Sequence, residues 1–128
     1  MRTRTRLASF LIGILLAGCA SLPPAKPATD FQAIAGTWVG TIYGRFGVAE
    51  STFTIKGDGS WENLVPRFTS PGPRFVGTAR VADGKYRWKS ETSGMTGTWT
   101  LHEGNGKKVL AIQTDDGGTT GQYEPKLQ

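Results

Sequence analysis

The sequence predicts an all-β protein, a small antiparallel up-and-down barrel of about eight strands that follows a signal peptide and a proline-rich tether. Two observations predict the strands. Apolar side chains recur at every second position through most of the chain beyond residue 30, and glycine-rich turns recur about every ten residues. A two-sheet β-sandwich is the alternative architecture for the same strands.

Residues 1–18 have the composition of a signal peptide. Arg2, Arg4 and Arg6 form a basic start, and residues 7–18 form an apolar run of twelve residues. A membrane-spanning helix needs about 20 apolar residues, so the run is too short to span a bilayer. We therefore expect these residues to direct export and exclude them from the domain.

Cys19, the only cysteine of the chain, stands directly after this run. The stretch Leu16-Ala17-Gly18-Cys19 resembles the signal motif of bacterial lipoproteins, in which cleavage before the cysteine is followed by attachment of a diacylglycerol to its thiol. The resemblance implies that Cys19 is lipidated, and the Ala20 and Ser21 that follow it imply the outer membrane, facing the periplasm. The alternative is a free buried thiol in an ordinary secreted protein.

Residues 19–30 are expected to form an extended tether, because they contain Pro23, Pro24 and Pro27 and little that could be buried. Residues 31–128 then form a single domain. Its patterned part, from Phe31 to Glu124, has roughly 94 residues, which is enough for a modest core.

Short hairpins are expected to make consecutive strands antiparallel neighbours. Their turns include Asp83-Gly84 and Asn105-Gly106, residue types that accept positive φ. The exception is the segment 66–73, which is too rich in proline for a central strand and predicts a longer loop. The expected strands cover residues 36–44, 49–57, 59–65, 73–82, 85–91, 95–103, 107–114 and 119–124.

Alternation sorts the strand side chains into an apolar and a polar face, and closing the strands into a barrel buries the first and removes exposed edges. The residues expected inside are Trp38, Ile42, Phe53, Ile55, Phe75, Ala79, Val81, Tyr86, Trp88, Trp99, Leu101, Leu110 and Ile112. Those expected outside are Thr41, Thr52, Thr54, Lys56, Thr78, Arg80, Lys85, Arg87, Lys89, Thr96, Thr98, Thr100, His102 and Gln113.

Two tripeptides carry a family resemblance. Gly36-Thr37-Trp38 opens the first expected strand, and Gly97-Thr98-Trp99 recurs in the sixth. A glycine two residues before an inward tryptophan resembles the signature of the lipocalin and avidin-like barrels, the calycins, and implies that the indole plugs one end of the barrel. The chain departs from that family because it has no arginine after Arg87 and no second lipocalin motif at residues 114–116.

Trp38, Trp88 and Trp99 are the candidate ligand-binding residues. Gly77 and Ala79 are small inward residues that would leave room for one small hydrophobic ligand or a lipid. The alternative is that the aromatic side chains fill the interior, since a barrel of about eight strands is just wide enough for its own side chains.

A candidate partner-binding surface is the loop from Arg67 to Arg74, which has a cation at each end and Phe68 near its start. A solvated connection between two strands is the alternative for this loop.

The composition argues against several classes of function. Removing the three arginines of the signal peptide leaves twelve basic and ten acidic side chains, so the mature chain is near +2 and its cations are scattered, which argues against nucleic acid as a partner. His102 is the only histidine and no cysteine follows Cys19, so we expect no metal and no cofactor. The sequence holds no G-x-S-x-G elbow and no phosphate-binding glycine loop, so we expect no enzyme.

The expected function is that of a membrane-anchored cell-envelope lipoprotein, whose small β-barrel is a structural or protein-interaction module that meets an envelope protein. The alternative is a calycin-like binding module for a small hydrophobic ligand or a lipid. Fold analogy alone does not choose between them, because one fold serves many functions.

Overall fold

The computed structural model describes residues 22–45, 47–66 and 74–127. Most of this part is β-structure. The strands are β1 (Ala25–Lys26), β2 (Gly36–Gly44), β3 (Gly47–Ile55), β4 (Ser60–Leu64), β5 (Arg74–Ala82), β6 (Lys85–Ser90), β7 (Thr96–Gly104), β8 (Lys107–Thr114) and β9 (Thr120–Pro125), and the 3₁₀ helix η1 is Phe31–Ala33.

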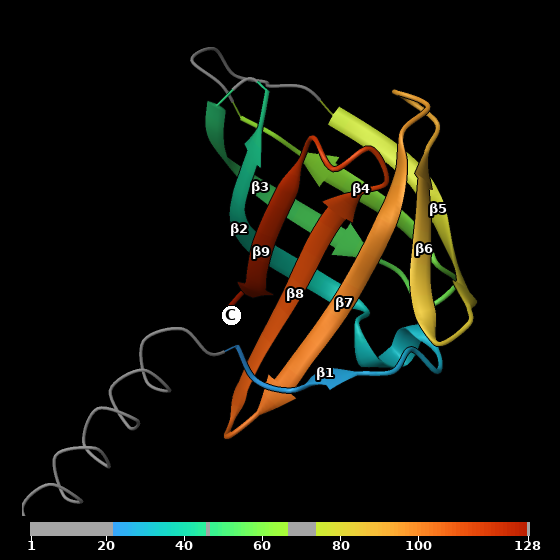
Figure 1. Ribbon diagram of the computed structural model, residues 1–128, viewed down its shortest axis with the longest axis vertical. Coiled ribbons are helices and arrows are strands. Elements are labelled where there is room, and N and C mark those ends of the chain that lie inside the picture. The colour runs from blue at the N-terminus through green and yellow to red at the C-terminus, as the bar shows by residue number, and fades with distance from the viewer. Residues whose placement is uncertain (1–21, 46, 67–73, 128) are drawn as a thin grey trace, which may run out of the picture.

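Strands β2 to β9 form a closed antiparallel barrel (Figure 1). Each strand pairs with the next one along the chain, and β9 returns to pair with β2, from Trp38 opposite Pro125 to Tyr43 opposite Thr120. The predicted all-β up-and-down barrel of eight strands is therefore confirmed. The sheet does not divide into the two layers of a sandwich, because the first and last strands of the barrel are hydrogen-bonded to each other.

Two of the hairpins turn at the expected dipeptides. Asp83 and Gly84 have φ angles of 54° and 72°, and Asn105 and Gly106 have φ angles of 53° and 76°. Two central residues with positive φ are what a two-residue type I′ turn requires, and its twist matches that of the flanking strands. These turns hold β5 against β6 and β7 against β8.

Residues 22–30, which we call the strap, lie against the barrel where the sequence predicted an extended tether. β1, within the strap, pairs with β7 in antiparallel register. The amide N–H of Glu103 donates to the carbonyl of Pro24 at 3.0 Å, and that of Ala28 donates to the carbonyl of Gly84 at 2.9 Å. The strap therefore crosses the lower end of the barrel in Figure 1.

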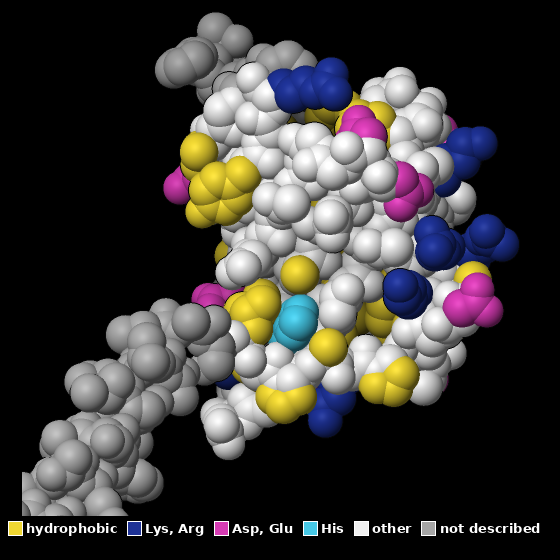
Figure 2. Space-filling view, in the orientation of Figure 1, with side chains coloured by type: hydrophobic (Ala, Val, Ile, Leu, Met, Phe, Trp, Pro, Cys, Tyr) yellow, Lys and Arg dark blue, Asp and Glu magenta, His cyan; other side chains and the backbone are white. Residues whose placement is uncertain are grey.

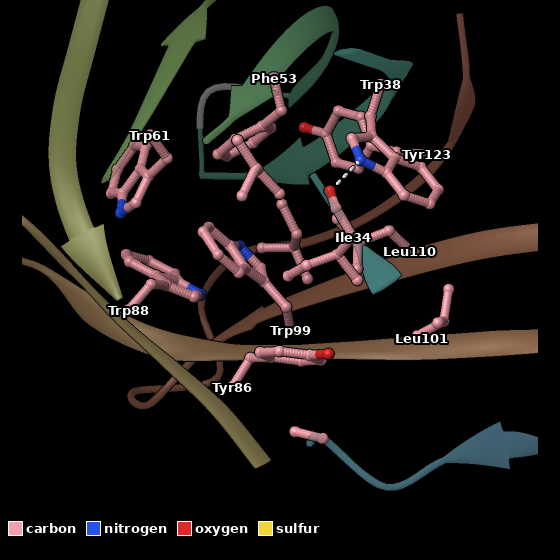
Figure 3. Close-up of a cluster of buried hydrophobic side chains, with 13 residues drawn as sticks. Ile34, Trp38, Phe53, Trp61, Tyr86, Trp88, Trp99, Leu101, Leu110 and Tyr123 are labelled. Carbon is pink, nitrogen blue, oxygen red and sulfur yellow. Dashed lines mark hydrogen bonds between the residues drawn. The ribbon is translucent and has the colours of Figure 1, made fainter. Parts of the chain in front are cut away.

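The helix η1 and the residue that follows it close the same end of the barrel. The Oδ1 atom of Asp30 caps the helix by accepting from the amide of Gln32 at 3.0 Å. Ile34 is fully buried, and its carbonyl accepts the Nε1–H of Trp38 at 2.8 Å (Figure 3). The hydroxyl of Tyr86 donates to the carbonyl of Asp30 at 2.6 Å. We call residues 30–34 the plug, and these bonds connect it to β2 and β6.

The inward face agrees with the alternation in the sequence. All of the side chains expected inside are either in the buried cluster or packed against it. Ala28, Ile34, Trp61 and Tyr123 also belong to this cluster, although the alternation did not assign them to it. Within the described ranges, no helix has the length and hydropathy needed to cross a membrane.

Candidate functional site

An aromatic cluster occupies the interior of the barrel (Figure 3). The ring centroid of Trp61 lies 5.8 Å from that of Trp88 and 6.1 Å from that of Trp99. The ring centroid of Phe53 lies 5.5 Å from that of Trp61 and 6.0 Å from that of Trp99. Three of these four pairs are edge-to-face, the arrangement that aromatic quadrupoles favour.

Small residues on the strands make room for these rings. A Cβ atom added to Gly77 would lie 2.5 Å from Cζ2 of Trp61, and one added to Gly97 would lie 2.6 Å from Cε2 of Trp88. Ala79, between them on the sheet, is half-buried and packs against the cluster. The indoles therefore stand in the space that the small residues leave free.

The structure brings together two of the three tryptophans that the sequence proposed as ligand-binding. Trp88 and Trp99 both lie beside Trp61, whereas Trp38 packs near the plug and is hydrogen-bonded to Ile34 (Figure 3). The sequence analysis missed Trp61. Alternation could have assigned it to the inside, since Trp61 stands between the polar residues Ser60 and Glu62.

A few polar atoms lie inside the barrel, but they form no acid–base pair. The hydroxyl of Ser51 donates to Oδ1 of Asn63. Burial raises the pKa of the Tyr123 hydroxyl well above its ordinary value, an effect that Ser51 partly opposes. The Nε1–H groups of Trp88 and Trp99 are buried without a hydrogen-bond partner among the described residues. These polar atoms lie among the packed side chains of the buried cluster.

Three of the predicted site residues, Cys19, Arg67 and Phe68, fall outside the described residues. Arg74, at the far end of the same loop, is described. Its Nη2 atom lies 2.7 Å from Oε2 of Glu62 on the neighbouring strand, and both side chains are substantially exposed. This cation is therefore held by an ion pair across β4 and β5.

Two depressions lie on the outer wall of the barrel. One, of about 300 Å³, crosses β7, β8 and β9 and is lined by uncharged polar side chains, among them Thr98, Gln113 and Gln122, with Tyr43 at its edge. The other, of about 330 Å³, crosses β5, β6 and β7. It is lined by Arg80, Arg87, Lys89, Thr78, Thr96 and Asp115, together with Ala79, Trp88 and Gly97. Of these two depressions, the second is the one that brings charged side chains together.

His102 lies on the outer face of β7, where its Nδ1 atom is 2.9 Å from the carbonyl of Pro23 in the strap. His102 therefore contributes a contact that holds the strap against β7. No three His, Cys, Asp or Glu side chains gather in a metal-binding arrangement within the part of the chain that the structure covers.

Comparison with known proteins adds no relative: no family model matches the chain, and neither a curated protein nor a solved structure matches it.

Proposed function

We propose that this protein is a lipid-anchored component of the bacterial cell envelope, whose filled barrel serves as a structural or protein-interaction module and not as an enzyme. The observation that carries the proposal is the packing of the interior: the indoles of Trp61 and Trp88 lie against Gly77 and Gly97, where a ligand of a hollow barrel would need room. The two depressions described above are on the outer wall instead.

The anchor in this proposal is a diacylglycerol on Cys19, and the membrane is the outer membrane, facing the periplasm. The motif at residues 16–19 supports it. Because the strap is bonded to the barrel from Pro24 onward, few residues separate Cys19 from the folded part. Three residues reach at most about 10 Å between Cys19 and Leu22, so the barrel would remain close to the bilayer surface.

Metabolic labelling with a clickable fatty acid tests the anchor. The wild-type chain should take up the label and sediment with membranes, while Cys19→Ser should take up none and be released in soluble form. Labelling of both chains to the same extent would contradict lipidation of Cys19.

Native mass spectrometry of the protein purified from its own host tests the filled interior. We expect the mass of the bare chain, together with tryptophan fluorescence that a panel of lipids and small hydrophobes leaves unchanged. A bound apolar molecule that disappears in Ala79→Leu would instead support the calycin-like binding module, because Ala79 lies against the aromatic cluster.

A further inference from the structure

The outer face of β6 carries a row of cations. Lys85, Arg87 and Lys89 alternate with the buried Tyr86 and Trp88, so the three cationic side chains share the outer face. On β5, Arg80 is the direct cross-strand partner of Arg87. We call these four cations the basic row. Dark-blue side chains gather over this side of the barrel in Figure 2.

Among the described residues, no acidic side chain forms an ion pair with the basic row. All ten acidic residues lie within the described ranges, and none of them has an oxygen within 4.0 Å of a nitrogen of the row. The ion pairs found there join Glu62 to Arg74, Glu124 to Lys107 and Glu103 to Lys108. Like charges directly opposite each other in a sheet destabilise it, so the Arg80–Arg87 pair has a cost that no ion pair in the described structure offsets.

Three of the four cations of the row, Arg80, Arg87 and Lys89, line a depression that has further hydrogen-bonding groups. The hollow of about 330 Å³ is lined by Arg80, Arg87 and Lys89 together with the hydroxyl-bearing Thr78 and Thr96. Thr96 Oγ1 donates to Oδ2 of Asp115 at 2.6 Å, so one carboxylate stands at the edge of the hollow. That negative charge limits where a bound anionic group can lie, and favours contact with the arginines and Lys89.

The basic row is directed away from the place where the chain leads to the proposed anchor. In Figure 1 the described chain begins at the left, just below the end of β9, while β6 lies on the opposite, right-hand side of the barrel. With the proposed anchor on Cys19 and at most about 10 Å of chain from there to Leu22, the bilayer would lie nearer the opposite side of the barrel while the strap is docked. The basic row would then face the aqueous phase.

We propose that the basic row binds an extended acidic segment of a partner protein. The cations of β6 stand at every second residue, so neighbouring cations are about 6.5–7 Å apart along the strand. An extended peptide with a carboxylate at every second position has the same spacing between its carboxylates. Guanidinium groups bind carboxylates through paired hydrogen bonds, and a carboxylate between Arg80 and Arg87 would relieve their repulsion. This inference rests on the proposed role as a protein-interaction module and names the partner's chemistry.

The test uses the chain from residue 19 onward with Cys19→Ser, which contains the strap and the whole barrel without the lipid. The probe is a fluorescein-labelled octapeptide of alternating Glu and Thr, and the comparison peptides are a Glu₄Thr₄ block and an alternating Gln-Thr sequence. Affinity is measured by fluorescence polarisation at two salt concentrations. We expect the alternating Glu-Thr peptide to bind most tightly, with affinity that falls as salt rises.

The matched variants reverse the same number of charges at two places. Arg87→Glu with Lys89→Glu should weaken binding of the alternating peptide at least about tenfold, as loss of paired charges does at other interfaces, whereas Lys107→Glu with Lys126→Glu should change it less than about twofold. The melting temperature of the Arg87→Glu, Lys89→Glu variant should be no lower than that of the parent, because the variant replaces the Arg80–Arg87 repulsion with an opposite-charge pair. A loss of binding is then not a loss of folding.

Three results would overturn the proposal: equal loss in both double variants, equal binding of the block and alternating peptides, or binding of phosphatidylglycerol vesicles in preference to every peptide. The last would indicate a membrane partner. Since the probe is added to unlipidated chain, failure here leaves the anchor on Cys19 standing, and failure of the lipid labelling leaves the peptide result standing.

Discussion

At the scale of the residue, the glycines of the barrel wall decide how the interior is filled. Gly77 sits beneath the ring of Trp61, and an added Cβ would meet both that ring and the backbone carbonyl of Lys89. A backbone carbonyl in a hydrogen-bonded sheet has little freedom to move, and a buried indole has few other rotamers available. The identity of this residue is therefore set by packing and not by a turn.

We accordingly expect Gly77→Ala to lower the free energy of unfolding by about 1–3 kcal/mol, the usual cost of overpacking. Urea denaturation followed by tryptophan fluorescence measures it. Gly57→Ala is the control, because the nearest atom to its added Cβ is the flexible amide nitrogen of Gln32 at 3.1 Å. Equal stability of the two variants would mean that the ring of Trp61 does not occupy this space.

At the scale of the element, the strap is held by a few specific contacts. Its backbone pairs with β7, bonds to Gly84 and accepts from the Tyr86 hydroxyl. Its buried side chain is Ala28, which is 8% exposed and belongs to the buried cluster. A short segment rich in proline has little internal structure to stabilise it. Burial of Ala28 therefore adds an apolar contact to the hydrogen bonds that dock the strap.

Ala28→Asp should release the strap, because burying a carboxylate without a partner costs more than the few docking contacts contribute. Hydrogen exchange at the amide of Glu103, which donates to Pro24 in the docked state, should become at least about tenfold faster, a difference of about 1.4 kcal/mol. Ala25→Asp, an exposed position in the same segment, should leave that exchange rate near the parent value. Unchanged exchange in Ala28→Asp would show that the strap does not need this contact.

At the scale of the whole molecule, the pairing of β9 with β2 closes the barrel. Six pairs of residues join the two strands, and β9 is also paired with β8. Without β9, β2 and β8 would each present a row of unpaired N–H and C=O groups, which are templates for pairing with other chains. Closure therefore protects the molecule from edge-to-edge association as well as burying its core.

Deleting residues 120–128 should convert the protein into high-molecular-weight or insoluble assemblies, since it opens the barrel and removes the buried Tyr123. Size-exclusion chromatography with light scattering measures the change. Deleting only residues 127 and 128 is the control, because Leu127 is 92% exposed, and this chain should elute as the parent does. A longer deletion that also elutes as the parent does would show that closure is dispensable.

The candidate site was only partly predictable from the sequence. Trp88 and Trp99 were assigned to the interior because their strands alternate clearly, while Trp61 was missed although it stands at the centre of the cluster. The cations of β6 were each placed on the outer face, but they were judged scattered. The spacing of Lys85, Arg87 and Lys89 could have identified the row, whereas the addition of Arg80 could not be seen, because it depends on the register between β5 and β6.

The sequence by itself determined the strands, their antiparallel order and their buried face, because alternation and turn dipeptides such as Asp83-Gly84 act within a few neighbouring residues. It also carries the anchor motif at Cys19, which stays a prediction. Only the tertiary structure decided the pairing of β9 with β2, the docking of the strap and the packing of Trp61 against Gly77. These contacts join segments far apart in the chain, and their energies depend on the register and packing of the whole barrel.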